Sequence, residues 1–227
     1  MDPGKRYVIA NAISPFMLAA ILFIAAGSLD IPRAWAFFAI SFVYLAATSF
    51  YLAKNNPELA KQRMEWNKRK DTLSWDRFLI IGYGLFQFYI QIIVIGLDMR
   101  YGWTGLGWEY GILGFLLLNI SQLLLFWSMA VNSYFETTVR IQKEKNQVVV
   151  TAGPYRYVRH PGYLGVMLWA LSPSLFIGSA AGLIPAIIAV ALLAVRTKME
   201  DGLLMRELPG YPEYAKKVRY MLLPLIW

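Results

Sequence analysis

The chain has 227 residues, of which 58% are hydrophobic and only 16% are charged, a composition too apolar for an ordinary soluble domain. It contains no cysteine and one histidine, which excludes disulfides and thiolate chemistry and leaves too few ligands for a zinc or di-iron centre. A net charge of +8 also occurs in nucleic-acid-binding proteins, but in a membrane protein a basic excess reports topology. We therefore expect neither a nucleic-acid partner nor a bound metal.

Apolar runs of roughly twenty residues, the length that crosses a hydrocarbon core of about 30 Å, recur along the chain. They predict six membrane-spanning helices, at residues 11–28, 33–53, 77–97, 109–131, 162–177 and 180–199. Because residues 1–10 are polar and no cleavage site follows the first run, that run is interpreted as a membrane anchor and not as a signal peptide. The last two helices are short, joined at residues 178–180 and interrupted by Pro173 and Pro185, so we expect a tight helical hairpin. The fold class is thus an all-α, polytopic integral membrane helix bundle.

The distribution of Lys and Arg predicts the orientation of these helices. With both termini cytoplasmic, all of the 22 basic residues except Arg33 and Arg100 fall in cytoplasmic segments, as the positive-inside rule requires. Residues 54–77 then form a cytoplasmic linker, with a helix start at Asn56-Pro57. Its apolar anchors, Met64, Trp66, Leu73 and Trp75, favour a position on the membrane surface over a solvated connector.

Amide side chains recur on the third and fourth predicted helices. Gln87 and Gln91 are four residues apart, and Asn119 and Gln122 are three apart, so each pair shares a helix face. Amides inside a bilayer need partners, and we expect these to join helices and not to contact a substrate.

The richest cluster of functional residue types is the segment from Gly153 to Gly165, with two Pro, two Arg, three Tyr and the one His of the chain. Its Gly-Pro and Pro-Gly pairs predict two bends around a rigid segment. Cations, aromatics and a histidine at the mouth of a membrane helix suit capture of a polar cofactor, although a basic juxtamembrane loop with interfacial tyrosines would look alike. Just before it, Val148, Val149 and Val150 predict an extended stretch with backbone groups available to a flat ligand.

Further along the chain, Arg196 and Glu200 share a helix face at i, i+4 spacing, which also describes a surface ion pair of little energetic value. All of these candidate residues fall on the predicted cytoplasmic side. A soluble cofactor reaches them there, while an apolar substrate enters from the lipid.

These residues carry a resemblance to a known family. Ala-Gly-x-Tyr-x-x-x-Arg-His-Pro-x-Tyr-x-Gly at 152–165 is followed by Arg196-x-x-x-Glu200, by Leu204 and by Tyr211-x-x-Tyr214. This pattern resembles the isoprenylcysteine carboxyl methyltransferase family of integral membrane, S-adenosylmethionine-dependent enzymes, and phospholipid N-methyltransferases are similar in the same region. The resemblance covers residues 142–220. It divides the single membrane domain into a helical scaffold, 1–131, and a cofactor-binding catalytic region, 132–227.

The resemblance implies that S-adenosyl-L-methionine lies between the 142–163 segment and the end of the sixth helix. The positions that match cofactor-binding residues of the family are Gln142, Gln147, Val148, Val149, Val150, Tyr155, His160, Pro161, Gly162, Tyr163 and Glu200. The catalytic candidates are Arg196, which matches a substrate position, together with Arg159 and Glu200. Three positions depart from the family pattern: Gln147 stands where several members have His, Gly162 replaces a small polar residue, and Asp201 follows Glu200 where a second Glu is usual.

The residue types fit the groups of this cofactor. Tyr155 or Tyr163 suits the sulfonium through cation–π attraction, and Glu200 suits the ammonium or the ribose hydroxyls. Arg159 and His160 suit the carboxylate. A carboxylate acceptor needs no general base, so positioning is the main requirement. Arg196 would orient that acceptor.

The predicted function is methylation of the carboxylate of a lipid-like substrate, most like that of a protein-S-isoprenylcysteine O-methyltransferase. A phospholipid or amine N-methyltransferase is the first alternative, and an NADPH-dependent membrane sterol reductase is the second. A non-catalytic transporter or scaffold is the third, but it predicts ionisable groups at mid-membrane depth, and the predicted spans carry almost none there.

Overall fold

The structure, a computed structural model, describes residues 3–69, 72–224 and 226–227. Residues 1–2, 70–71 and 225 belong to the predicted N-terminal, linker and C-terminal segments and lie outside the described residues. The longer helices are α1 (Pro3–Ala26), α2 (Pro32–Asn55), α4 (Ser74–Gly84), α5 (Gln91–Tyr101), α6 (Trp108–Val131), α7 (Pro161–Ile177) and α8 (Leu183–Glu207). The shorter elements are α3 (Pro57–Met64), η1 (Trp66–Lys68), η2 (Leu85–Ile90), η3 (Lys143–Lys145), η4 (Gly153–Arg156) and α9 (Tyr211–Lys217).

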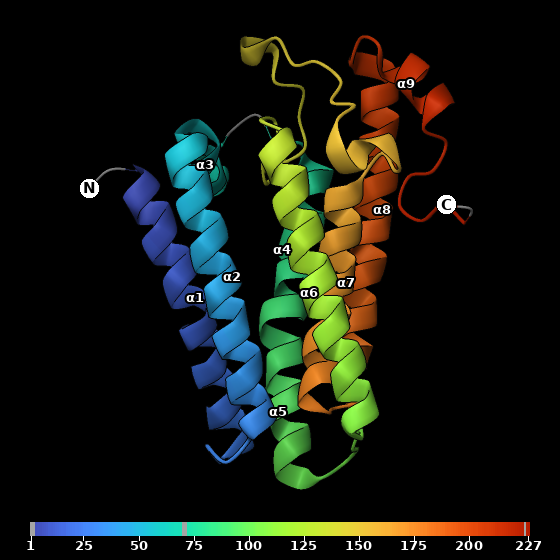
Figure 1. The fold of residues 1–227 in the computed structure, drawn as a ribbon. Helices are drawn as coiled ribbons and strands as arrows, with labels where there is room; N and C mark the ends of the chain where they lie inside the picture. The colour runs from blue at the N-terminus through green and yellow to red at the C-terminus, as the bar shows by residue number, and fades with distance from the viewer. Residues whose placement is uncertain (1–2, 70–71, 225) are drawn as a thin grey trace.

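The described helices form a multi-pass membrane bundle (Figure 1). Within the described ranges, four helices are long and apolar enough to cross a membrane, at Gly4–Ala26, Pro32–Asn55, Ser74–Tyr101 and Trp108–Val131, and α7 is a shorter apolar helix. The third of these runs through α4, the π-helical segment η2 and α5 without a break. Large apolar side chains on the outside of these helices, such as Ile24, Phe50, Phe78, Ile112 and Leu123, are exposed, as a lipid-facing surface requires.

A helix occupies each of the six predicted positions, but two details predicted for the last two helices are wrong. The sixth helix continues past 199 to Glu207, and neither proline interrupts its helix. Pro185 lies in the first turn of α8, where its missing N–H would have had no intrahelical acceptor. Pro173 lies inside α7 and leaves the carbonyl of Trp169 without its backbone donor, but the hydroxyl of Ser172 donates to that carbonyl at 2.9 Å.

The predicted helical hairpin is present. α7 ends at Gly178, whose φ of 108° is left-handed, and the Gly178 N–H donates to the carbonyl of Ser174 at 3.0 Å. α8 then runs back along α7 (Figure 1). On its other face α7 packs closely on α6, because a side chain at Gly114 would come within 2.3 Å of the backbone of Phe176.

The expectation that amides join the helices is confirmed at two of the four positions. Gln91 Nε2 donates to the carbonyl of Ala170 at 3.0 Å and to Ser174 Oγ at 2.8 Å, which links α5 to α7. Asn119 Oδ1 accepts from the hydroxyl of Tyr44 at 2.5 Å, which links α6 to α2. The other two amides, Gln87 and Gln122, make no side-chain hydrogen bond within the described part of the chain.

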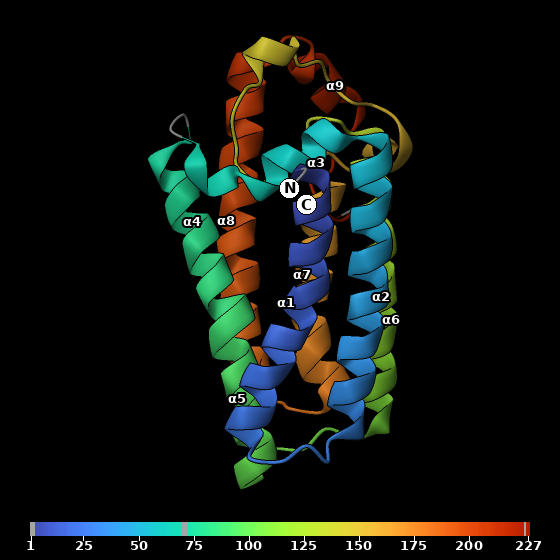
Figure 2. The ribbon, with the colours of Figure 1, turned by 90° about the vertical axis from the view of Figure 1, so that its left-hand side faces the viewer.

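The two ends of the bundle differ in character (Figures 1 and 2). The short loops that join α1 to α2, α5 to α6 and α7 to α8 lie at one end. There Arg33 donates to the carbonyls of Leu106, Leu175 and Phe176, which gives a structural role to one of the two basic residues predicted to lie outside the cytoplasmic segments. The linker containing α3, the segment between α6 and α7, and α9 lie at the other end with both termini. α3 begins as predicted, with Asn56 Oδ1 accepting from the Leu59 N–H at 3.1 Å and Pro57 in the first turn.

Candidate functional site

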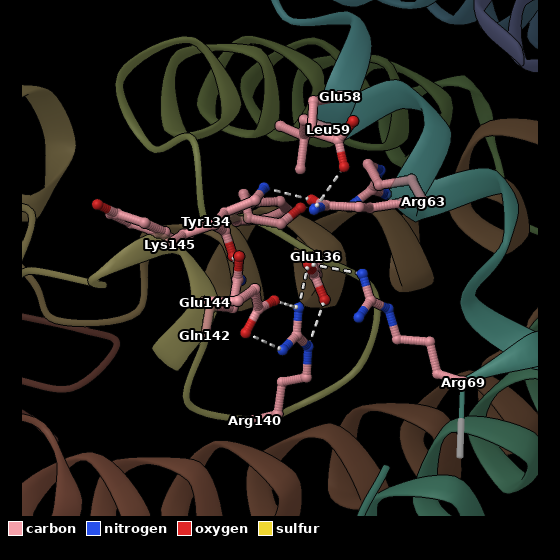
Figure 3. Close-up of polar contacts among 12 residues, drawn as sticks. Glu58, Leu59, Arg63, Arg69, Tyr134, Glu136, Arg140, Gln142, Glu144 and Lys145 are labelled. Atoms are coloured by element: carbon pink, nitrogen blue, oxygen red, sulfur yellow. Dashed lines mark hydrogen bonds and ion pairs between the residues drawn. The ribbon is translucent and has the colours of Figure 1, made fainter. Parts of the chain in front are cut away.

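The segment between α6 and α7, residues 132–160, crosses the end of the bundle without forming a long helix of its own. Ion pairs around the buried carboxylate of Glu136 hold its first half. Glu136 pairs with Arg140 at 2.9 Å and with Arg69 at 3.2 Å, and Arg140 also pairs with Glu144 at 2.5 Å (Figure 3). The hydrogen bond from Arg140 lowers the pKa of Glu144 to about 2. Since Arg69 belongs to the linker, these contacts tie the 132–160 segment to the part of the chain that follows α3.

The same segment is also hydrogen-bonded to α3. Arg63 Nη1 donates to the carbonyl of Phe135 at 3.1 Å, and Lys145 Nζ donates to Gln62 Oε1 at 2.8 Å. Within the segment, Gln142 Nε2 donates to the carbonyl of Tyr134 at 2.8 Å (Figure 3). The segment is therefore a fixed part of the structure with a defined inner surface.

Four predicted residues on that inner surface keep polar groups available. Gln142 Oε1 is buried without a hydrogen-bond partner, while its backbone N–H donates to Gln147 Oε1 at 2.8 Å. The backbone groups of Val148, Val149 and Val150 make no hydrogen bond to the described residues. Buried polar groups are normally paired, so the unpaired Gln142 Oε1 points to a ligand site, and the free backbone groups of the partly exposed valines add hydrogen-bonding capacity beside it.

The motif residues Arg159 and His160, at the start of α7, both contact the carboxylate of Asp201. Asp201 on α8 accepts from Arg159 Nε at 2.8 Å, from Arg159 Nη2 at 3.1 Å and from the hydroxyl of Tyr211 at 2.7 Å, and His160 Nε2 lies 3.0 Å from it. Burial alone would raise the pKa of Asp201, but the hydrogen bonds from His160 and Arg159 outweigh it and leave that pKa below its usual value. Burial, and next the charge of Asp201, raise the pKa of Tyr211.

Arg159 has little capacity left for a ligand. Its Nη1 also donates to the carbonyls of Val218 and Arg219, at 3.0 and 2.8 Å, so four of the five guanidinium N–H groups have protein acceptors. His160 Nδ1, in contrast, has no partner in the described ranges. Tyr155 lies next to this cluster, where its hydroxyl accepts from Asn132 Nδ2 at 2.8 Å and its carbonyl accepts from the hydroxyl of Tyr214 at 2.7 Å.

Arg196 and Glu200 do not form the exposed ion pair that their spacing also allowed. Arg196 is 9% exposed and donates through Nε to Asp76 Oδ1 at 2.7 Å and through Nη2 to the carbonyl of Thr137 at 2.7 Å. Its guanidinium carbon lies 5.2 Å from the centre of the Tyr163 ring. Glu200 Oε2 accepts from the hydroxyl of Tyr163 at 2.5 Å.

The predicted residues meet at one cavity of about 930 Å³. Of the candidates, those that line it are Gln142, Gln147, Val148, Val149, Val150, Tyr155, Arg159, His160, Gly162, Tyr163, Arg196 and Glu200. Pro161 is buried as the first residue of α7 and does not line the cavity. Gly162, one of the departures from the family pattern, is required by packing, because a side chain there would come within 2.2 Å of the Phe135 ring.

The cavity also has an apolar arm that the sequence did not predict. Residues of α1, α2 and the region around η2 line it, among them Met17, Leu18, Ile21, Phe37, Phe38, Leu45, Leu85 and Phe88. These helices had been assigned to the scaffold alone. The periodicity of an apolar helix does not distinguish the face that lines a cavity from the face that meets lipid, so their sequence carried no signal for this role.

The profile of the "Isoprenylcysteine carboxyl methyltransferase (ICMT) family" matches residues 112–206, from α6 to the end of α8. Over residues 112–206 the chain is therefore similar to that family. The match contains the whole 132–160 segment, the Arg159–His160–Asp201 cluster and both Arg196 and Glu200. It leaves out Asp76, Tyr211 and the apolar arm from α1 and α2.

Individual relatives agree with this family. The "Protein-S-isoprenylcysteine O-methyltransferase" of Schizosaccharomyces pombe is 31% identical over 86 residues, which cover 37% of this chain and 36% of that protein. The protein of the same name in Saccharomyces cerevisiae is 30% identical over 110 residues, which cover 47% of this chain and 46% of that protein. A "Probable protein-S-isoprenylcysteine O-methyltransferase" of Oryza sativa subsp. japonica is 28% identical over 86 residues, 37% of this chain and 45% of its own. The chain thus matches less than half the length of each of these relatives.

Proposed function

We propose that this protein is an integral membrane methyltransferase that uses S-adenosylmethionine to methylate the carboxylate of a prenylcysteine-like lipid. The observation that carries the proposal is that a single cavity combines two environments. One part is lined by the polar residues of the 132–160 segment, α7 and α8, and the other by apolar side chains of α1, α2 and η2. A charged cofactor and an amphiphilic acceptor can therefore meet in one site.

The residues present fit the cofactor. The unpaired Gln142 Oε1 and the free backbone groups of Val148–Val150 supply hydrogen-bonding positions for an adenine and a ribose. Glu200 supplies a carboxylate for the ammonium or the ribose hydroxyls, and His160 Nδ1 supplies a position for the cofactor carboxylate. Arg159, with four of its N–H groups committed, mainly holds α7 to α8 and the tail.

The chemistry asks little of the protein beyond orientation. When bound, S-adenosylmethionine supplies an electrophilic methyl group on a sulfonium. Arg196 holds the acceptor carboxylate by the N–H groups that it does not donate to Asp76 and Thr137. Tyr163, held by Glu200, presents its ring next to that guanidinium. A carboxylate is already the nucleophile, so no side chain has to remove a proton, and in-line placement is the main contribution of the site.

The arrangement of the bundle supports a cytoplasmic active site. The two termini, the linker and the 132–160 segment lie at one end (Figures 1 and 2), which is the end that carries most of the basic residues. We propose that α7 and α8 complete six passes, with both termini and the polar part of the cavity on the cytoplasmic side. The scaffold of 1–131 and the catalytic region of 132–227 then form one domain, with the scaffold supplying the wall for the lipid.

Two measurements on the detergent-solubilised full chain test the proposal. Isothermal titration should show binding of S-adenosylhomocysteine and none of NADPH; the reverse result would establish the reductase alternative. A methyl-transfer assay should show an ester formed on N-acetyl-S-farnesylcysteine and no transfer to phosphatidylethanolamine. Transfer to the amine lipid alone would favour the N-methyltransferase alternative, and an absence of both S-adenosylhomocysteine binding and transfer would refute the proposal.

A further inference from the structure

Asp76 is a fully buried carboxylate in the first turn of α4, outside the region that matches the family. Its two oxygens have different partners. Oδ1 accepts from Arg196 Nε at 2.7 Å, and Oδ2 accepts from the backbone N–H of Val139 at 2.8 Å. Asp76 therefore connects α4, the 132–160 segment and α8 at a single point. It does not line the cavity, whereas Arg196 does.

The same point fixes the direction of the Arg196 side chain. Nε donates to Asp76 and Nη2 donates to the carbonyl of Thr137, both at 2.7 Å, so one edge of the planar guanidinium is fully occupied by protein acceptors. Nη1 has no partner within the described ranges, and the guanidinium carbon lies 5.2 Å from the centre of the Tyr163 ring. Two of the five N–H groups are used; of the three that remain, two are on Nη1 and one is on Nη2.

A simple neutralising role does not account for this geometry. One contact to a carboxylate would compensate the buried charge of Arg196, yet Asp76 also accepts from the backbone N–H of Val139. Thr137, two residues before Val139, supplies the second acceptor. The Asp76 carboxylate and the Thr137 carbonyl are thereby held in place relative to each other. The Arg196 guanidinium has one orientation in which it donates to both. A long, flexible side chain gains binding power when its free donors are held in position before the ligand arrives.

We propose that Asp76 is a positioning residue, which holds the Nη1 end of Arg196 toward the cavity for the carboxylate of the methyl acceptor. The inference rests on the proposed function in assigning that carboxylate to Arg196. The placement of the Arg196 guanidinium by Asp76 can be tested without assuming the proposed function.

The test compares Asp76→Asn and Asp76→Glu with wild type. Because loss of a buried charge can prevent folding, Asp76→Glu provides a variant that keeps the charge and moves it by one methylene. The control is Asp98→Asn, which alters another fully buried carboxylate that does not line the cavity. Kinetics should show kcat/KM for farnesylcysteine lowered about tenfold or more by either Asp76 variant, with S-adenosylhomocysteine affinity within about threefold of wild type. Asp98→Asn should leave both values unchanged per folded molecule.

A double-mutant cycle separates positioning from general damage. If Asp76 acts through Arg196, Asp76→Glu combined with Arg196→Lys should be no slower than Arg196→Lys alone. Additive losses, or wild-type kinetics in both Asp76 variants, would overturn the inference while leaving the proposed function intact.

Arginine ¹⁵N NMR of the S-adenosylhomocysteine-loaded protein provides a measurement that needs no turnover. The Nε–H signal of Arg196, assigned by its loss in Arg196→Lys, should exchange with water at least about ten times faster in Asp76→Glu than in wild type. Unchanged exchange would refute the positioning role. If wild type methylates no carboxylate but the exchange rate rises as expected, the proposed function fails and the placement of Arg196 by Asp76 stands.

Discussion

The hydroxyl of Tyr163 on α7 donates a 2.5 Å hydrogen bond to Glu200 on α8, and both side chains line the cavity. The two residues come from separate parts of the sequence motif, and this bond brings them together across the helical hairpin. Because Tyr163 also lies against Arg196, the groups proposed for the cofactor and for the acceptor share one wall. The two parts of the sequence motif, at 152–165 and at 196–200, thus contribute side chains to the same wall of the cavity.

Glu200→Gln should weaken cofactor binding without loss of fold. The amide oxygen can still accept from Tyr163, but the charge proposed to meet an ammonium or two hydroxyls is gone. Loss of a charge-assisted hydrogen bond costs about 1.5–3 kcal/mol, so the affinity for S-adenosylhomocysteine should fall roughly ten- to a hundredfold by isothermal titration. Glu207→Gln, at the exposed end of the same helix, is the control. Wild-type affinity in Glu200→Gln and also in His160→Ala would show that the cofactor lies elsewhere.

Arg196→Lys tests the acceptor site. Lysine keeps the charge but lacks the planar fork, so it cannot hold Asp76, Thr137 and a carboxylate together. We expect S-adenosylhomocysteine affinity within about threefold of wild type and kcat/KM at least about tenfold lower, a loss of about 1.4 kcal/mol of transition-state stabilisation. Arg206→Lys, an exposed arginine on the same helix, should be silent. Normal turnover by the Arg196 variant on the best carboxylate acceptor would remove Arg196 from the acceptor site.

The sequence was sufficient to locate the helices and the residues around the cavity, because those signals are local. Apolar runs marked the helices, and Gly, Pro and the motif residues marked the bends. Helix ends were less accurate where packing extends a helix into polar sequence. α1 begins at Pro3 and not at residue 11, and Tyr7 in the added turns is buried against Leu52 and Leu59.

The partners of the charged residues could not be predicted, because they are set by the tertiary fold. Asp76 is 120 residues from Arg196, and as an acidic residue in the first turn of a helix it needed no distant partner to explain it. Asp201 was noted as a departure from the family pattern, and its contacts with Arg159, His160 and Tyr211 became visible only in the structure.

Glu136→Gln should loosen the 132–160 segment. The side chain of Glu136 is 2% exposed and pairs with both Arg140 and Arg69, so its neutralisation leaves these cations less well compensated. We expect the melting temperature to fall by about 4–8 °C, for a loss of about 2 kcal/mol, and S-adenosylhomocysteine binding to weaken about tenfold. Glu65→Gln breaks the exposed pair with Lys68 and should change neither quantity. A stable Glu136→Gln with normal affinity would mean that these ion pairs do not shape the cofactor site.

Single cysteines test the membrane topology, and the chain offers a clean background because it contains no cysteine. Ser28 and Gly105 are exposed in the loops at one end of the bundle, and a side chain at Gly105 meets nothing within 4 Å. Ser74 and Thr151 are exposed at the other end. In intact cells, a membrane-impermeant maleimide should label Ser28→Cys and Gly105→Cys, and it should label Ser74→Cys and Thr151→Cys only after the cells are opened. Labelling of Thr151→Cys in intact cells would place the cavity mouth outside the cell, where a cytoplasmic cofactor could not reach it.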